Sequence, residues 1–291
     1  MNVLSLFDGM SGGQVALKEI GFSNINYYAS EIKPHAIKVT QLNFPNTVQL
    51  GDISKLSYKN GYLHSENGTF YIGKVDLLIG GSPCKNLSFI NKHDRSGLNG
   101  EKSKLFYEFH RLFKEVSPSN FLLENVASMK NVDRDIIDKM MGVKHVKINS
   151  SLLTAQTRNR YYWTNLTIEE IADKEISLKD VIDYEAAPEE KWTDKKLKFI
   201  EKKLASNSRM YVKIDGDKSI PITARGYQAW NSQFVTGKYG VRDLTINEFK
   251  KLQTIPTWYS FGDLKKSKIT DLIGDGWTID VIIHILRSIK I

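Results

Sequence analysis

The alternation of short apolar segments with amphipathic segments in the first half of the chain constrains the fold most. The apolar segments predict strands at residues 2–7, 25–30, 47–50, 75–79 and 121–123. Apolar side chains recur at helical spacing in residues 13–20, 34–42 and 104–116. Strands that alternate with helices need crossover connections, which favour a mainly parallel sheet with helices on its faces. We therefore predict a doubly wound α/β fold.

The second half of the chain has a different character. Residues 167–240 are polar and rich in lysine, with aromatic residues scattered among them, and the strand–helix alternation is lost. This change predicts a second, smaller domain that begins near residue 167. An amphipathic helix is expected at residues 279–289.

Composition restricts the class of protein. No apolar run approaches the roughly 18–20 residues of a membrane span, and the N-terminus lacks the pattern of a signal peptide. The single cysteine, Cys84, has no partner for an internal disulfide, so a reducing compartment and a cytoplasmic location are expected. The net charge of +8 is compatible with a polyanionic partner, although many basic proteins bind none.

Unusual residues gather in three loops that follow predicted strands, at residues 7–13, 80–91 and 124–129. In open α/β sheets, ligands bind at the carboxyl ends of the strands. We therefore expect these loops to face one cleft.

The first loop, Phe7-Asp8-Gly9-Met10-Ser11-Gly12-Gly13, has glycines that let the backbone approach a ligand. Glu31 ends the second strand and is placed to accept hydrogen bonds from ribose hydroxyls, and Asp52 follows the third strand and suits the amine of an adenine. The spacing differs from G-x-G-x-x-G, so an adenosine without phosphates, such as S-adenosylmethionine, fits better than a dinucleotide. The alternative is a tight turn with two surface acids.

Cys84 follows Gly80-Gly81-Ser82-Pro83 in a strand-to-loop turn. Pro83 restricts the backbone on both sides and would hold the thiol in one direction. Lys85 and Lys92 supply positive charge, which favours a nucleophilic thiolate. A lone cysteine is otherwise most often a small buried hydrophobic residue.

Two further motifs carry charged groups. Glu124 ends the apolar run at residues 121–123, where it could share a proton, or else simply cap a helix or form a salt bridge. Arg158 and Arg160 are spaced to point to one side of an extended segment, which suits a phosphate or a base edge, or else solvent.

The order of these motifs resembles that of the cytosine-C5 DNA methyltransferase family. The matching stretches are FDGMSGG, GGSPC, ENV, QTRNR, RDLTINEFKKLQTIP and GDGWTIDVIIHIL, which span nearly the whole chain. The residues within these motifs are most similar to those of the animal de novo branch and its phage and bacterial relatives. Residues 167–220 match least.

The resemblance implies a Rossmann-like catalytic domain at 1–166, a target-recognition domain at 167–262, and a segment at 263–291 that returns to the catalytic domain. It implies that Cys84 attacks C6 of a flipped-out cytosine, that Glu124 contacts N3 and the exocyclic amine, and that Arg158 and Arg160 orient these groups. The methyl donor would be S-adenosylmethionine, in a pocket formed by Phe7, Asp8, Gly9, Gly12, Glu31, Asp52, Ile53, Asp275 and Trp277.

The implied partner is double-stranded DNA, with no membrane, metal or obligate protein partner. Its expected contacts are Ser82, Lys85, Asn125 and Arg225, and the last of these would read a guanine or touch a phosphate. Two positions depart from the bacterial pattern: Lys85 replaces a glutamine, and Gly-Asp-Gly-Trp replaces Gly-Asn-Ala-Val. The second departure weakens the assignment of Asp275 and Trp277.

Three other functions are compatible with parts of this pattern. A transfer-RNA cytosine methyltransferase would use the same catalytic residues. A non-catalytic DNA-binding relative would usually lack Cys84 or Glu124. A nucleotide methylase would not need the polar second domain.

Overall fold

The computed structural model describes residues 1–89, 94–206 and 212–289 and divides into two compact units. Unit 1 comprises Met1–Ile148, Asn159–Glu169 and Ile282–Ile291, and unit 2 comprises Asn149–Arg158 and Glu170–Val281. The polar second half thus forms most of unit 2. Compact units need not coincide with functional domains, so the limits 1–166, 167–262 and 263–291 stay predictions.

Unit 1 is built on a seven-stranded sheet with the order β3-β2-β1-β7-β8-β10-β9. The pairs β1–β2, β2–β3, β1–β7 and β7–β8 are parallel, whereas β8–β10 is antiparallel. This confirms the predicted α/β fold with a mainly parallel sheet. The strands are β1 Asn2–Leu6, β2 Asn26–Ser30, β3 Val48–Gln49, β7 Leu77–Gly81, β8 Asn120–Val126, β9 Val146–Asn149 and β10 Asn159–Thr164.

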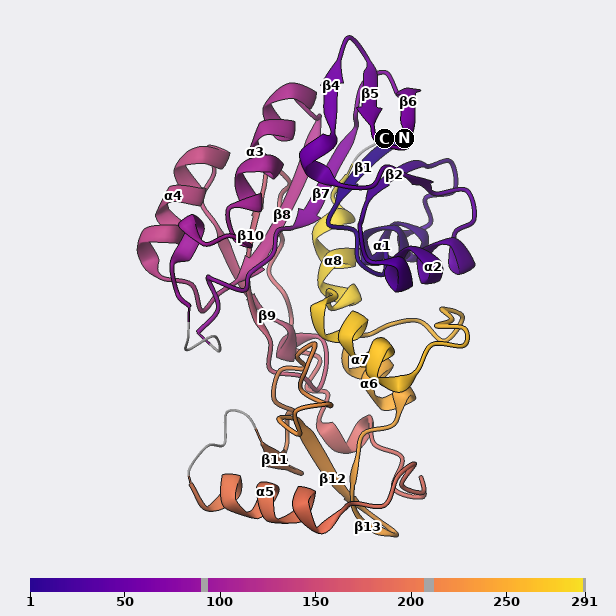
Figure 1. Cartoon of the computed structure of the whole chain (residues 1–291), viewed down its shortest axis with the longest axis vertical. Coiled ribbons are helices and arrows are strands. Elements are labelled where there is room, and N and C mark those ends of the chain that lie inside the picture. Colours follow the sequence, from indigo (N-terminus) through magenta and orange to yellow (C-terminus); the bar gives the residue numbers. More distant parts are fainter. Residues whose placement is uncertain (90–93, 207–211, 290–291) are drawn as a thin grey trace. The chain divides into compact units, whose positions relative to one another are not determined.

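Helices cover both faces of this sheet (Figure 1). From β1 the chain passes through α1 and α2 toward one edge, and from β7 it passes through α3 and α4 toward the other, so right-handed crossovers place the two pairs on opposite faces. A Cβ on Gly13 of α1 would meet Ile79, whereas one on Gly80 would meet Phe109 of α3. The helices are α1 Gly12–Ile20, α2 Pro34–Asn43, α3 Leu105–Val116 and α4 Asn131–Met141.

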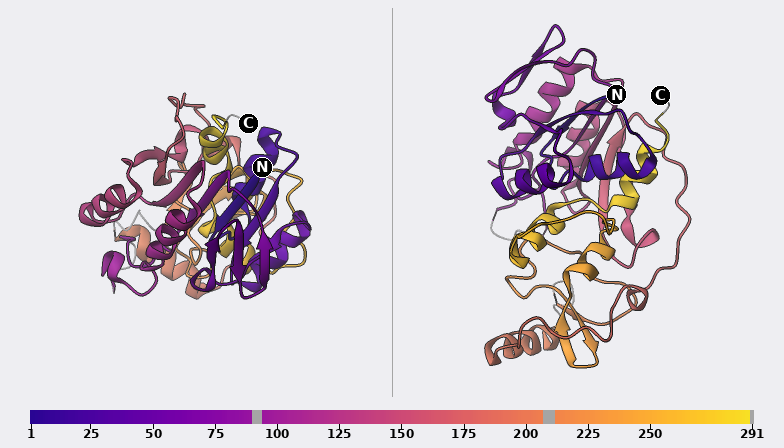
Figure 2. Two further views of the ribbon diagram at one scale, coloured as in Figure 1. Left: turned by 90° about the horizontal axis from the view of Figure 1, so that it is seen from above. Right: turned by 90° about the vertical axis from the view of Figure 1, so that its right-hand side faces the viewer.

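A small antiparallel sheet, which the sequence did not lead us to expect, interrupts the connection from β3 to β7. It consists of β4 Ser57–Lys59, β5 Tyr62–Ser65 and β6 Gly68–Tyr71. Leu63 is fully buried and Phe70 packs on the core of unit 1, while Tyr62 and Tyr71 are exposed. Figure 2 shows this sheet at the end of unit 1 where the N-terminus lies.

Unit 2 has its own small core of Ile200, Val212 and Phe234. Its three-stranded sheet has the order β11-β12-β13. Its elements are α5 Asp194–Ala205, β11 Lys213–Ile214, β12 Gln233–Gly237, β13 Gly240–Asp243, α6 Ile246–Leu252 and α7 Lys266–Asp275. α8, at Ile279–Leu286, begins in unit 2 and ends in unit 1.

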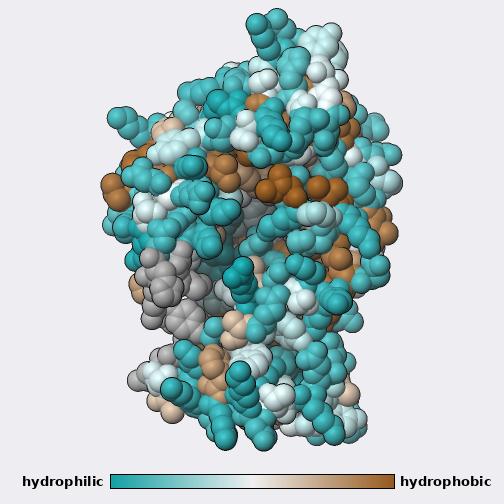
Figure 3. Space-filling model, in the orientation of Figure 1, coloured by the Kyte–Doolittle hydropathy of each residue, from teal (hydrophilic) through white to brown (hydrophobic). Residues whose placement is uncertain are grey.

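The described ranges also contain four short 3-10 helices. They are η1 Ile53–Lys55, η2 Gly97–Asn99, η3 Ser150–Leu152 and η4 Leu178–Asp180. Within the described ranges, no helix is both long and apolar enough to cross a bilayer. The face shown in Figure 3 is mainly hydrophilic, with hydrophobic residues in small groups.

Candidate active site

Backbone hydrogen bonds draw together the ends of β1, β2 and β3. The Asp8 N–H donates to the Ser30 carbonyl at 3.1 Å, and the Gly9 N–H donates to Oε2 of Glu31 at 2.8 Å. The Ser30 hydroxyl donates to the Gly51 carbonyl at 2.7 Å, next to Asp52. The structure therefore brings the predicted cofactor loop beside both predicted acidic residues.

The loop after β1 has an unusual backbone. Phe7, Gly9 and Ser11 all have a φ of 59°, in the left-handed region. That conformation costs glycine little but is unfavourable for a bulky side chain such as that of Phe7. Strain of this kind is commonly found at ligand sites. The loop ends at Gly12, the buried first residue of α1.

Asp8 lies in this loop, and within the described part of the chain only one of its two carboxylate oxygens accepts hydrogen bonds. Its Oδ1 accepts hydrogen bonds from the Ser5 hydroxyl at 2.6 Å and the Tyr27 hydroxyl at 2.9 Å. Its Oδ2 is buried and has no hydrogen-bond partner among the described residues. Burial raises the pKa of Asp8 to about 6. The site thus holds an acceptor that suits the amino group or the positive charge of a ligand.

The other predicted cofactor residues in unit 1 have defined partners. Oε1 of the buried Glu31 accepts from the N–H groups of Ile32 at 2.7 Å and Lys33 at 2.9 Å. Asp52 caps η1 by accepting from the Ser54 N–H at 2.9 Å. Ile53 is buried in the core. The carboxylates of Glu31 and Asp52 keep lone pairs for a ligand, and their contacts with the ribose and the adenine of S-adenosylmethionine stay predictions.

Cys84 is half-buried, forms no disulfide, and lies at the start of a turn after β7. Its carbonyl accepts from the N–H groups of Leu87 at 3.0 Å and Ser88 at 2.8 Å. Before it, the Asn125 side-chain amide donates to the carbonyl and the hydroxyl of Ser82, both at 3.0 Å. Ser82 and Asn125 are buried, so they hold the cysteine loop against β8, and their predicted contact with nucleic acid stays a prediction.

Strand register brings Arg160 to Glu124. Glu124 lies opposite Tyr162, and Arg160 lies opposite Val126, in the antiparallel β8–β10 pair. Arg160 and Glu124 are therefore diagonal neighbours on one face of the sheet, within reach of long side chains. Their side chains form an ion pair, Arg160 Nε to Glu124 Oε1, at 2.8 Å. Gly81, three residues before Cys84, lies opposite Glu124 on β7, so all three groups share this edge of the sheet.

Asn86 is a residue of this site that our sequence interpretation missed. Its buried side chain accepts from the N–H groups of Lys102 at 3.1 Å and Ser103 at 3.2 Å, which fixes the segment after Cys84. The sequence feature that could have identified Asn86 is its place as a polar residue two positions after the candidate nucleophile Cys84. Lys85 is exposed beside the thiol, and Lys92 lies outside the described residues.

Arg158 has a different environment from Arg160. It is buried in unit 2, where its guanidinium donates to the carbonyls of Ile222 at 2.8 Å, Gly274 at 3.0 Å and Gly276 at 2.9 Å. Arg158 thus holds backbone carbonyls of unit 2, whereas Arg160 pairs with Glu124, although their spacing suggested a shared side. Direct contact of Arg158 with a base stays a prediction.

Three predicted ligand residues lie in unit 2. Asp275 is exposed and Trp277 is half-buried, in the segment whose backbone Arg158 binds. Arg225 is exposed in a turn between β11 and β12. Their proposed contacts with cofactor and DNA remain untested.

Three of the recognised motifs meet in a buried hydrogen-bond network in unit 2. The Gln156 amide donates to Oε1 of Gln253 at 3.1 Å, and the Gln253 amide donates to the Ile273 carbonyl at 2.8 Å. The Thr278 hydroxyl donates to the same Oε1 of Gln253 at 2.7 Å. Gln253 therefore joins QTRNR, RDLTINEFKKLQTIP and GDGWTIDVIIHIL, which explains why polar residues are needed at these buried positions.

Charged groups that could hold a metal do not cluster in the part of the chain that the structure describes. The candidate chemistry therefore rests on a thiol, a carboxylate–guanidinium pair and an acidic pocket at the ends of β1 to β3.

The family model described as C-5 cytosine-specific DNA methylase matches residues 1–145 and 134–291. Among curated proteins, the chain is similar to DNA (cytosine-5)-methyltransferase DRM2 of Oryza sativa subsp. japonica, with 37% identity over 121 residues, which are 40% of this chain and 20% of the relative. It is also similar to the type II methyltransferase M.NgoBV of Neisseria gonorrhoeae, with 34% identity over 143 residues, 48% of this chain and 31% of the relative. The matched regions thus cover less than a third of either relative's length.

Solved structures show the same fold at low identity. The Entamoeba histolytica methyltransferase EhMeth superposes with a TM-score of 0.77 at 15% identity, covering 99% of this chain and 97% of that one. Spodoptera frugiperda DNMT2 superposes with a TM-score of 0.69 at 19% identity, covering 99% and 98%.

Proposed function

Because the chain belongs to the C-5 cytosine-specific DNA methylase family, we propose that it transfers a methyl group from S-adenosylmethionine to C5 of a cytosine in double-stranded DNA. S-adenosylmethionine is the methyl donor of this family and supplies an electrophilic methyl group on a sulfonium. The observation that supports the proposal most directly is the half-buried Cys84, on a loop that Asn125 fixes to β8, the strand that also carries Glu124 of the Arg160–Glu124 ion pair.

The thiol answers the chemical difficulty of the reaction. C5 of cytosine is a poor nucleophile. When the Cys84 thiolate bonds to C6, the electron pair of the C5–C6 double bond becomes available at C5, which takes the methyl group as the C–S bond of the donor breaks. A base then removes the C5 proton, and elimination re-forms the double bond and releases Cys84.

Glu124 and Arg160 would stabilise this adduct. Adding sulfur to C6 builds negative charge on the ring, and the Glu124 carboxyl would hold a proton at N3 and accept from the exocyclic amine. Arg160 fixes the orientation of that carboxyl through its 2.8 Å contact. Preorganised groups of this kind stabilise developing charge at no cost of reorganisation.

Asp8, Glu31 and Asp52 would bind the donor at the ends of β1 to β3. The unpartnered Oδ2 of Asp8 would accept a hydrogen bond or face the positive charge of the ligand. The target cytosine must leave the base stack to reach Cys84, at a cost of a few kcal/mol. Lys85 and unit 2, which includes Arg225, would then hold the DNA.

The test is transfer of labelled methyl from S-adenosylmethionine to duplex DNA and, in parallel, to transfer RNA. We expect label in DNA, and its loss in Cys84→Ala, with Glu201→Gln on the exposed face of α5 as the matched surface control. If only transfer RNA becomes labelled, the substrate is transfer RNA and the proposal of a DNA substrate is wrong. DNA with 5-fluorocytosine should trap a covalent complex, and full activity of Cys84→Ala would refute the adduct.

A further inference from the structure

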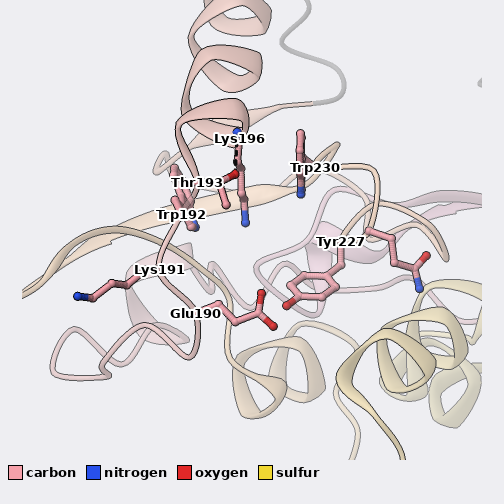
Figure 4. Close-up of a pocket in the computed structure, with 8 residues that line it drawn as sticks. Glu190, Lys191, Trp192, Thr193, Lys196, Tyr227 and Trp230 are labelled. Carbon is pink, nitrogen blue, oxygen red and sulfur yellow. Dashed lines mark hydrogen bonds between the residues drawn. The ribbon is translucent and has the colours of Figure 1, made fainter.

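Unit 2 contains a pocket of about 200 Å³ that the proposed chemistry does not use (Figure 4). One wall comes from Trp192 and Lys196, before and in the first turn of α5, and the other from Tyr227 and Trp230 in the turn before β12. The pocket is smaller than the roughly 300–1,000 Å³ of a typical drug-sized site. It therefore suits one small planar group.

The aromatic walls are fixed by the core beneath them. The Trp192 ring packs edge-on against Phe234 at 5.0 Å, and the Trp230 ring packs edge-on against Phe199 at 5.6 Å. The Trp192 indole N–H donates to Asp243 at 2.8 Å. Trp230 also has a φ of 56°, an unfavourable backbone conformation for a bulky residue. Rigid aromatic walls bind planar rings with little loss of side-chain entropy.

Two lysines at the pocket already have partners, and a third, Lys191, lines it as an exposed residue. Lys196 pairs with Asp243, and its ammonium lies 4.7 Å from the centre of the Trp192 ring. Lys266 pairs with Glu189 at 2.9 Å and lies 4.9 Å from the centre of the Tyr227 ring. A ligand ammonium would be repelled by Lys196, which takes the position over Trp192 that a bound cation would use.

Glu190 supplies the one carboxylate among the residues that line the pocket. Its carboxylate points toward the Tyr227 hydroxyl in Figure 4 and has no hydrogen bond or ion pair among the described residues. Burial, with Glu190, Asp243 and Glu189 nearby, raises the pKa of Tyr227 to about 12. The carboxylate oxygens of Glu190 favour a ligand with N–H donors.

We propose that this pocket binds one unstacked guanine of the nucleic-acid substrate, with Trp230 and Tyr227 against its faces and Glu190 accepting from N1–H and the N2 amino group. Guanine is the base with two adjacent N–H donors on its Watson–Crick edge, which matches the two oxygens of a carboxylate. Adenine and cytosine place an acceptor next to their amino group, and thymine has a single donor between acceptors. The inference rests on the proposed function for the presence of nucleic acid.

Binding of single-stranded pentanucleotides TTGTT, TTATT, TTCTT and TTTTT to the full chain, followed by tryptophan fluorescence, tests the proposal. We expect TTGTT to bind about 10-fold more tightly than the others. Glu190→Gln should abolish this preference, whereas Glu201→Gln, an equal change of charge on α5 outside the pocket, should keep it.

A second pair of variants separates base stacking from loss of folding. Trp230→Ala should weaken binding of all four oligonucleotides about 10-fold or more, and Trp230→Phe should restore most of it. Equal binding of the four oligonucleotides, or displacement of TTGTT by tetramethylammonium, would overturn the proposal. The assay contains no methyl donor, so a failure here is distinct from a failure of methyl transfer.

Discussion

The residue that most sharpens the candidate site is Arg160, because strand register alone places its guanidinium on Glu124. The sequence suggested two equivalent arginines, but the structure gives them separate tasks. Arg160 binds a carboxylate of unit 1, whereas Arg158 binds three backbone carbonyls of unit 2. Their substitution should therefore have different consequences.

Arg160→Ala should lower kcat for methyl transfer about 10–100-fold, because Glu124 would lose the partner that orients it. Arg160→Lys should recover part of this loss, since it keeps the charge but not the planar geometry. Steady-state kinetics and thermal unfolding of both variants provide the check. If Arg160→Ala loses activity only because it is largely unfolded at the assay temperature, as a strongly lowered Tm would show, the role of Arg160 is purely structural.

Asp8 gives a pH-dependent prediction at the same scale. Burial raises its pKa from 3.8 to about 6, so the native state binds more protons than the unfolded chain between these values. Its contribution to stability is complete below pH 4 and is lost as the pH rises to about 6. As the pH rises over this range, the free energy of unfolding of the wild type should fall by about 1–3 kcal/mol more than that of Asp8→Asn.

Urea unfolding of both proteins at pH 4 and pH 7, without cofactor, measures this difference. The asparagine keeps an oxygen that can accept from Ser5 and Tyr27, so the comparison isolates the charge. Parallel stability–pH curves for the two proteins would show that Asp8 has an ordinary pKa.

At the scale of elements, the contact between β1, β7 and α3 leaves no room for a side chain at Gly80. A Cβ there would lie 2.6 Å from the Leu6 carbonyl oxygen and 3.0 Å from the Phe109 ring. The nearest atom belongs to the backbone of β1, so relief would require the strands to separate. This close packing sets the start of the Cys84 loop.

Gly80→Ala should destabilise the protein by about 3 kcal/mol through overpacking. Gly142→Ala is the control, since its Cβ would meet nothing within 4 Å and only its φ of 71° is unfavourable. That control should cost about 1 kcal/mol. Chemical denaturation measures the unfolding free energy of both variants. Equal losses of stability would mean that β1 and β7 separate at little cost to admit the new Cβ.

For the whole molecule, the net charge of +8 predicts that electrostatics contributes much of the DNA affinity. Each phosphate contact releases counterions, so binding should weaken steeply with salt. We expect the Kd for a nonspecific duplex to rise at least about 10-fold between 50 and 200 mM NaCl. Fluorescence anisotropy gives the slope, and an affinity independent of salt would argue against a DNA substrate.

Much of the architecture followed from local pattern. Apolar runs of strand length between amphipathic segments determine a mainly parallel sheet, because few connections satisfy both the burial of these runs and right-handed crossovers. The β4–β6 sheet was not predicted because its strands are short and exposed on one face, as at Tyr62 and Tyr71, so its pattern resembles that of a loop.

What the sequence by itself determined was the fold class and the order of the motifs, since these depend on chain direction and side-chain periodicity. Only the tertiary structure decided which groups share a hydrogen bond. Arg160 binds Glu124, and Gln253 joins three distant motifs, because such contacts depend on strand register and on the meeting of segments remote in the chain.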